Sequence, residues 1–370
     1  MPRDAENSDL TTVVLRVDPT APDPAAIARA AACLREGGLV AFPTETVYGL
    51  GVHALDVDAV GRLFTVKGRP SHDPLIVHVA SFEQIAPLVA WQNAPADRAD
   101  AQTRAAELAR RFWPGPLTLV LPRAAGVPLE VTAGLDTVAV RIPSHPVARA
   151  LLATAEVPVA APSANLFSRP SPTQAAHVLQ DLEGRIDIVL DGGPTTVGVE
   201  STVLDLTASR PMVLRPGAVT LEMLRELLPD VELRGDTGQR SEADTGPLPS
   251  PGLLTTHYAP RVPMTLYEGA HATARMIDDA RAAIGRGQHV GVLVPREDGP
   301  AFELLPVQRA LLGAEADPAA LARRLYAALR ELDVSGVDLI LAKGVGGPGG
   351  LGLALRDRLR RAAGGHIVET

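Results

Sequence analysis

The segment from Leu39 to Val79 constrains the fold of this chain more than any other part of it. It opens with a short apolar run, LVAF, that ends at Pro43, and it closes with a second apolar run, LIVHV, that contains His78. Short runs of this kind, bounded by glycine and proline, are typical of buried strands. Polar residues follow the first run, and ligands of open α/β sheets bind beyond the ends of strands. The segment therefore predicts a sheet with a binding site at the strand ends.

Two kinds of polar side chain stand at these predicted strand ends. Thr44 and Thr46 follow the first run, and Lys67 and Arg69 precede the second in what we expect to be a proline-containing loop. Lys67 is notable because the chain has 35 lysine and arginine residues, and all but Lys67 and Lys343 are arginine. A compact ammonium beside a planar guanidinium suits a polyphosphate site. A solvated surface pair is the alternative interpretation.

Length and composition set the broad class. A chain of 370 residues that is 46% hydrophobic predicts two globular domains with ample cores. The net charge of −8 argues against sequence-independent nucleic-acid binding as the main role. A single cysteine, Cys33, excludes a disulfide framework within the chain. The first residues lack the pattern of a signal peptide and no apolar stretch could span a bilayer, so we expect a cytoplasmic protein.

The order of strand-like and helix-like segments predicts an α/β protein with two sheet-forming parts. Strands alternate with helices in the second part, which favours a mostly parallel sheet there. We expect three strands in that part, near 264–267, 289–295 and 337–344. We expect a disordered N-terminus at 1–10, a first domain at 11–228, a linker at 229–262 and a second domain at 263–370.

The predicted linker ends in a segment, SPGLLTTHYAP, that is too specific for a spacer. Leu253 and Leu254 are apolar, and His257 and Tyr258 can stack on a ligand or form hydrogen bonds with it. Linkers of this length are often functional. We expect 250–260 to fold over the first domain's pocket as a lid, and to cross between two sheets that do not share a core.

Further strand ends carry the same types of polar side chain. Arg141 lies near the end of an apolar strand, where a charge is costly unless it binds a ligand or forms an internal salt bridge, and both interpretations stay open. A hydroxyl, Ser163, and an amide, Asn165, follow another predicted strand in the motif PVAAPSAN. Such a pocket suits an amino acid together with a polyphosphate. The candidates from the residues alone are Thr44, Thr46, Lys67, Arg69, Arg141, Ser163, Asn165, Ser171, Ser201 and Arg215.

Other familiar sites fit poorly. Residues 344–349 read GVGGPG, but the proline and the lack of a following ribose-binding unit argue against a dinucleotide site. No P-loop motif and no GxSxG motif is present. His72 and His78 lack a second pair of ligands nearby in sequence, so we expect no metal held by the protein itself.

The motifs resemble those of the YrdC/Sua5 family of threonylcarbamoyl-AMP synthases. PTETVYGLG, KGRP and PLIVHV are followed in the family's order by FWPGPLTLVL, VAVRIPSHP, PVAAPSANLFSRPSPT, ESTVLDL and VLRPG. This likeness covers 11 to about 225, and the tail from about 263 resembles the C-terminal domain of the long, Sua5 form. The resemblance implies an open twisted sheet of the YrdC type with a concave ligand pocket, followed by a smaller, Rossmann-like α/β domain.

The resemblance also implies an activity and a set of site residues. Enzymes of this family convert L-threonine, bicarbonate or CO2 and ATP into threonylcarbamoyl-AMP and pyrophosphate, with Mg2+ arriving on ATP. A separate transferase complex then modifies adenosine 37 of tRNAs that read codons beginning with A. Lys67 and Arg69 resemble the catalytic cations. The threonine-binding set corresponds to Thr46, His78, Arg141, Ala161 and Ser201, and the ATP-binding set to Arg69, Asp73, Thr137, Ser163, Ser171, Arg215 and Tyr258.

Two other functions stay open. One is an RNA-binding or ribosome-maturation module that uses the same concave face, which would show steep salt dependence. The other is carbamoyl transfer of the kind that matures hydrogenases, which would need zinc-finger and acylphosphatase-like segments that this chain lacks. We expect a monomer with, at most, weak direct contact with RNA.

Overall fold

A computed structural model gives the fold. The expectation of a disordered N-terminus at 1–10 concerns residues that the structure does not describe, except Leu10. Much of the predicted linker, Leu253 included, also lies outside the described residues. The described residues are 10–93, 101–235, 246, 248–250, 252, 254 and 256–370.

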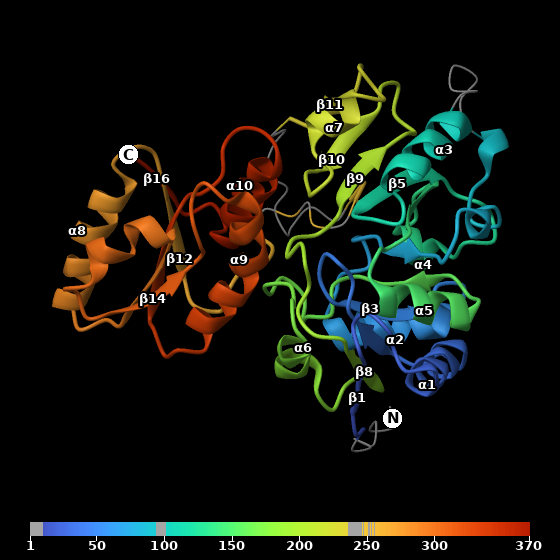
Figure 1. Cartoon of the computed structure of the whole chain (residues 1–370), viewed down its shortest axis with the longest axis horizontal. Helices are drawn as coiled ribbons and strands as arrows, with labels where there is room; N and C mark the ends of the chain where they lie inside the picture. Colours follow the sequence, from blue (N-terminus) through green and yellow to red (C-terminus); the bar gives the residue numbers. More distant parts are fainter. Residues whose placement is uncertain are drawn as a thin grey trace.

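One large mixed sheet forms the N-terminal unit, by which we mean elements β1 to β11 with their helices (Figure 1). Within the described residues its strand order is β1-β8-β2-β3-β7-β4-β6-β5-β9-β10-β11. The two apolar runs of the opening segment form β2 and β4, as predicted. The strands are β1 Val13–Arg16, β2 Val40–Phe42, β3 Gly49–His53, β4 Ile76–His78, β5 Leu117–Pro122, β6 Thr137–Arg141, β7 Val159–Ala160, β8 Ile188–Asp191, β9 Thr202–Asp205, β10 Met212–Arg215 and β11 Glu232–Leu233.

Local sequence signals explain where the helices of this unit begin and end. Asp23 and Asp56 accept hydrogen bonds from backbone N–H groups of the first turns of α1 and α2. Helix α2 stops at Gly68, which has a left-handed φ of 62°. The helices are α1 Pro24–Arg35, α2 Val57–Lys67, α3 Ala101–Phe112, α4 Leu129–Thr132, α5 Pro146–Ala155, α6 Ala175–Leu182 and α7 Leu221–Arg225, with 3-10 turns at Glu83–Ile85 and Trp91–Asn93.

The C-terminal unit, elements β12 to β16 with α8 to α10, has a smaller sheet. All of its strand pairs are parallel, in the order β14-β13-β15-β12-β16, which confirms the prediction of a parallel sheet. Helix α8 covers one face, and α9 and α10 cover the other (Figure 1). The bounds are β12 Met264–Glu268, α8 Ala272–Gly285, β13 Val290–Val294, β14 Val307–Leu311, α9 Pro318–Asp333, β15 Leu339–Lys343, α10 Leu351–Ala362 and β16 Ile367–Glu369, with a 3-10 turn at Arg296–Phe302.

Helices α9 and α10 lie on the side of the C-terminal unit that faces the N-terminal unit (Figure 1). Val47 and Val199 of the N-terminal unit belong to the same buried apolar cluster as Leu325 and Leu329 of α9. Both of these N-terminal residues lie in loops outside the strands, so the contact joins loops of one unit to a helix of the other and does not merge the two sheets into one core. Helix α9 therefore presents apolar side chains both to its own sheet and to the neighbouring unit. None of the helices in the described part of the chain is long and apolar enough to cross a membrane.

The backbone of the N-terminal unit approaches α9 closely at Gly198, which generates a prediction. Its φ is +85°, and a Cβ there would lie 2.5 Å from Arg323 Cα on the backbone of α9. Gly198→Ala should therefore lower the free energy of unfolding by about 1–3 kcal/mol, because it combines backbone strain with a clash against main-chain atoms. Thermal unfolding monitored by circular dichroism measures this.

The matched control is Gly61→Ala, within α2, where a Cβ would meet nothing within 4 Å. It should stabilise the protein by roughly 0.5–1 kcal/mol, because alanine is the better helix former. Equal melting temperatures for the two variants would contradict the close approach at Gly198.

Candidate active site

The candidate site is a cavity, partly open to solvent, at the strand ends of the N-terminal unit. His78 and Arg141 end the neighbouring strands β4 and β6 and are directly paired in register. Ser201 precedes β9, and Arg215 ends β10 on the same side of the sheet. The lining residues are Thr44, Thr46, Val47, Gly49, Arg69, Ile76, His78, Arg141, Ala161, Pro162, Ser163, Glu200, Ser201, Arg215, Gly252, His257 and Tyr258.

A fixed guanidinium forms one end of the cavity. Arg141 is buried, and its donors reach Gly115 O at 3.3 Å, Thr46 Oγ1 at 3.0 Å and Glu45 Oε1 at 2.6 Å. These contacts use three of the five N–H groups of an arginine, so donors remain for a ligand carboxylate. The interpretation of Arg141 as an internal salt bridge is therefore confirmed, and ligand binding by Arg141 stays a prediction.

His78 completes this end as a neutral side chain. Its Nδ1 lies 3.2 Å from Ile76 O, and since a carbonyl can only accept, Nδ1 carries the proton and Nε2 keeps a lone pair. Burial, reinforced by the nearby Arg141, lowers the pKa of His78 to about 3. The ring is therefore an acceptor at neutral pH.

Two further guanidinium groups, those of Arg69 and Arg215, line the cavity. Arg69 donates to Asp73 O at 3.1 Å and Pro74 O at 2.7 Å, and it forms an ion pair with Asp73 at 2.9 Å. Arg215 donates to Ser201 O at 3.1 Å and reaches Ser201 Oγ at 3.3 Å. Because main-chain oxygens hold both groups, their positive charges are fixed before any ligand binds.

Lys67 does not line the cavity. It is the last residue of α2 and is buried, and its ammonium donates to Ser163 O at 2.5 Å and to Asn165 O. Burial, together with the charge of Arg69, lowers the pKa of Lys67 well below its usual value. The expectation of a loop containing both cations is wrong, because α2 continues as far as Gly68. The alternative of a solvated surface pair is wrong as well.

Glu200 is a buried carboxylate in the cavity wall. It accepts hydrogen bonds from Ser171 Oγ at 2.6 Å, Tyr326 OH at 2.9 Å and Arg358 Nε at 2.7 Å. Burial opposes its ionisation, but Arg358 and Arg215 outweigh burial and lower the pKa of Glu200 to about 2. Sequence reasoning did not select Glu200, although it begins the ESTVLDL motif; an acid before a strand is no distinctive signal.

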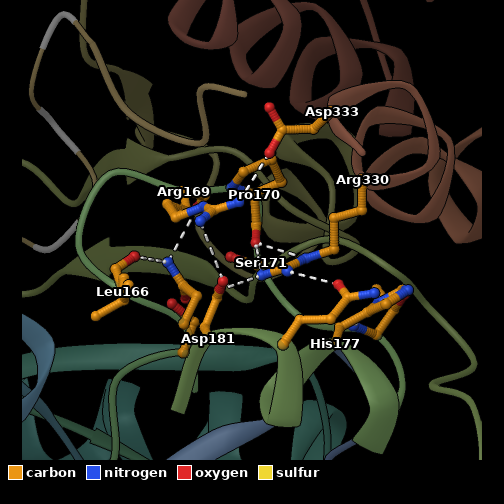
Figure 2. A network of polar contacts seen from close by, with 12 residues as sticks. Leu166, Arg169, Pro170, Ser171, His177, Asp181, Arg330 and Asp333 are labelled. Carbon is orange, nitrogen blue, oxygen red and sulfur yellow. Dashed lines mark hydrogen bonds and ion pairs between the residues drawn. The ribbon is translucent and has the colours of Figure 1, made fainter. Parts of the chain in front are cut away.

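The segment between Ser163 and Ser171 is held from the C-terminal unit, as Figure 2 shows. Arg330 of α9 donates to Pro170 O at 2.6 Å and pairs with Asp181 at 2.7 Å. Asp333, at the end of α9, pairs with Arg169 at 2.7 Å. The loop that carries Ser171 therefore depends on docking of the second unit.

The described residues of the linker also reach the cavity. Gly252, His257 and Tyr258 line it, and Tyr258 adopts a φ of 62°. The Tyr258 ring packs 5.6 Å from that of Tyr326 and lies 5.3 Å from the Arg358 guanidinium. Among the described residues its buried hydroxyl has no hydrogen-bond partner. A buried unpaired hydroxyl is costly, which is consistent with a ligand that contacts it.

Comparisons with known proteins indicate one family for both units of the chain. A family model named Sua5_yciO_yrdC, described as telomere recombination, matches residues 32–217. A second, described as the C-terminal domain of threonylcarbamoyl-AMP synthase, matches residues 219–364. The chain belongs to the Sua5 family. This confirms the resemblance seen in the sequence, including the long form.

Named relatives of this Sua5 chain are similar over almost their full length. Threonylcarbamoyl-AMP synthase of Pyrococcus abyssi is 45% identical, over 92% of this chain and 94% of the relative. The synthase of Bacillus subtilis is 44% identical, over 93% and 94%. The crystal structure of P. abyssi Sua5 complexed with L-threonine is 42% identical and covers 97% of this chain and 100% of its own, with a TM-score of 0.87. The expected fold, a YrdC-like unit followed by a C-terminal unit, is thereby confirmed.

The structure of this Sua5 protein brings most of the predicted site residues together. Those that line the cavity are Thr44, Thr46, Arg69, His78, Arg141, Ala161, Ser163, Ser201, Arg215 and Tyr258. Thr137 instead faces a smaller cavity beside Pro249 and Ser250. Lys67, Asp73, Asn165 and Ser171 stand behind the lining as its supports. The roles of all these residues in binding stay predictions.

The low pKa of His78 predicts how stability depends on pH. A histidine with a folded-state pKa of about 3 and an ordinary value of 6.5 binds fewer protons when folded than when unfolded. Its contribution is therefore complete above pH 6.5 and is lost as the pH falls toward 3. It should add up to about 1.4 kcal/mol per pH unit to the slope between those limits.

His78→Gln should flatten the pH dependence, because glutamine does not titrate. Urea unfolding at pH 6, 5 and 4 for the wild-type protein and the variant measures the difference. The carboxylates contribute equally to both proteins and cancel in the comparison. Identical slopes would show that His78 is not the buried neutral acceptor described above.

Proposed function

We propose that this chain is a threonylcarbamoyl-AMP synthase, which makes threonylcarbamoyl-AMP and pyrophosphate from L-threonine, bicarbonate or CO2, and ATP. The observation that carries this proposal is one cavity lined by Arg141, which keeps donors for a ligand carboxylate, and by two further fixed cations, Arg69 and Arg215. Membership of the Sua5 family supports the same reaction. The product would serve the N6-threonylcarbamoyl modification of tRNA.

The Arg141 end fits L-threonine. The remaining N–H groups of Arg141 would bind the α-carboxylate, and the neutral Nε2 of His78 would accept a hydrogen bond from the substrate's amine or hydroxyl. Thr46 is already fixed against Arg141 and would help to orient the amino acid. Ala161 and Ser201 complete the wall that would surround the side chain.

The part of the cavity at Arg69 and Arg215 fits the phosphates of ATP. Arg69 and Arg215 would stabilise phosphate oxygens, and Ser163 and Tyr258 would add hydrogen-bond donors. Lys67 would support the lining without contacting the ligand, because its ammonium holds the Ser163 and Asn165 carbonyls in place. Asp73 fixes Arg69, and Ser171 is fixed by Glu200. We propose that Thr137, which lies beyond this cavity, contributes to the nucleotide end through the neighbouring linker residues.

The reaction depends on how the protein positions the substrates more than on covalent catalysis by its side chains. The neutral threonine amine adds to CO2 and releases one proton to solvent, which forms an N-carboxylate. One carboxylate oxygen then attacks the α-phosphorus as the bond to the pyrophosphate oxygen breaks. In the described part of the chain, no cluster of three or more His, Cys, Asp or Glu side chains could hold a metal ion. Mg2+ therefore enters the proposal as part of the ATP substrate.

The linker residues that line the cavity suit a cover. Ala259 N donates to Ser168 O at 2.7 Å, and His257 packs 5.7 Å from the Phe167 ring, so this part of the linker is anchored beside the nucleotide side. A cover would protect a labile adenylate from water. We propose monomeric action, a cytoplasmic location and transfer of the product to a separate tRNA-modifying complex.

Pyrophosphate release tests the function. The protein with MgATP, bicarbonate and L-threonine should release pyrophosphate, and omission of any one should reduce release to background. L-serine should be the poorer substrate, since one methyl group is worth roughly 1–3 kcal/mol. Arg69→Ala serves as the inactive control. Equal rates with serine and threonine, or release without threonine, would contradict the assignment.

The unpaired hydroxyl of Tyr258 predicts a second result. Tyr258→Phe removes that hydroxyl and keeps the ring contacts with Tyr326 and Arg358. It should raise the KM for ATP by about three- to tenfold, as expected for one lost hydrogen bond, with little change in melting temperature. Tyr267→Phe, in β12, is the matched control and should leave the KM for ATP unchanged. An unaltered KM in Tyr258→Phe would remove the hydroxyl from the nucleotide site.

A further inference from the structure

Arg358 is a fully buried arginine in the C-terminal unit. It lies in α10, with 0% relative exposure. Full burial of an arginine is rare unless its charge and its donors are all satisfied. The partners of Arg358 therefore show what this residue is for.

Most of those partners belong to the wall of the cavity. Arg358 Nε donates to Glu200 Oε2 at 2.7 Å, and its NH2 group donates to Pro216 O at 3.0 Å, directly after Arg215. The guanidinium lies over the Tyr258 ring at 5.3 Å. Its remaining ion pair, at 2.5 Å, is with its neighbour Asp357. One side chain of α10 thus contacts the wall at Glu200, beside Arg215 and at Tyr258.

The buried charge of Glu200 explains why the cavity wall needs Arg358. It is the one acidic residue in the described lining, and the other charged groups there are Arg69, Arg141 and Arg215. A polyphosphate in the cavity would be repelled by an unneutralised carboxylate at this place. Removing the partner of a buried ion also leaves an uncompensated charge, which costs several kcal/mol. Arg358 provides both the counter-charge and the geometric restraint.

We propose that Arg358 is a positioning residue for the nucleotide: it neutralises Glu200 and holds Glu200, Arg215 and Tyr258 in the geometry that accepts the phosphates. The C-terminal unit then contributes to the reaction through one guanidinium, not only through docking. This inference rests on the proposed function insofar as ATP is the ligand of that side.

Docking of the units does not depend on Arg358 alone. Arg330 pairs with Asp181 at 2.7 Å, Asp333 pairs with Arg169 at 2.7 Å, and α9 shares the apolar cluster with Val47 and Val199. Loss of the Arg358 side chain should therefore leave the two units docked. Its effect on ATP can then be measured in a folded, full-length protein.

The test compares steady-state kinetics and direct binding of ATP for the wild-type protein and Arg358→Met. The variant should have a KM for ATP raised about tenfold or more, as expected for an unpaired buried charge facing the ligand. The KM for L-threonine should change by less than about threefold, because the Arg141 end has no contact with Arg358. Arg358→Lys keeps the charge without the fork and should lie between the two.

The double variant Glu200→Gln/Arg358→Met is the decisive comparison. It removes the uncompensated carboxylate, so its affinity for ATP should be higher than that of Arg358→Met alone. Arg356→Met is the matched control: Arg356 lies on the same helix, pairs at 3.2 Å with Glu268 of the C-terminal unit and is 44% exposed. It should behave like the wild-type protein. If Arg358→Met does not fold, Arg358→Lys and the double variant carry the same comparison.

The outcomes separate the two proposals. An unchanged KM for ATP in Arg358→Met, an equal rise for both substrates, or a double variant no better than the single one would overturn the role of Arg358. A wild-type protein that binds ATP but releases no threonine-dependent pyrophosphate would overturn the proposed function instead. Weaker ATP binding in Arg358→Met would still support the inference in that case.

Discussion

The buried carboxylate of Glu200 is the constraint on which the rest of this structure depends. An ion removed from water must be paired and fully hydrogen-bonded, or the fold loses several kcal/mol. Two of its partners, Tyr326 and Arg358, belong to the C-terminal unit, and the third, Ser171, belongs to a loop that the same unit clamps through Arg330. The wall of the cavity is therefore complete only when both units are docked.

The cations of the cavity differ from Glu200, because the main-chain oxygens that accept from Arg69, Arg141 and Arg215 belong to the N-terminal unit. Arg141 and Arg215 stand at strand ends, and Arg69 follows the end of α2, and each donates to main-chain oxygens. Fixed positive charges need no reorganisation when phosphate charge develops, which is where a reaction with little covalent chemistry gains its rate. In the proposed function, the threonine-binding part would thus depend on one sheet, and the second unit would act on the nucleotide-binding part.

The sequence predicted β2, β4 and β6 and the parallel sheet of the C-terminal unit, because buried strands with strong apolar runs carry their own signal. It did not predict β14 and β16, whose exposed and half-buried residues at the sheet edges show no such pattern. Arg141 and His78 were found because a polar side chain at the end of an apolar strand is conspicuous. The sequence predicted Lys67 in a loop after a helix that ends near Val66, but α2 includes Lys67 and is capped by Gly68; helix ends are the least certain boundaries.

By itself, the sequence determined β2, β4 and β6 of the central sheet, the caps of α1 and α2 and the set of hydroxyls and cations at the strand ends, because these depend on short-range patterns and local backbone preferences. It did not indicate β3, whose glycines show no apolar run. Only the tertiary structure decided that Lys67 supports the cavity from behind, that Val47 and Val199 pack against α9, and that Glu200 is paired by Arg358. The physical reason is that burial of a charge is settled by partners far away in the chain. Glu200 and Arg358 are 158 residues apart, and no local pattern at either position indicates the other.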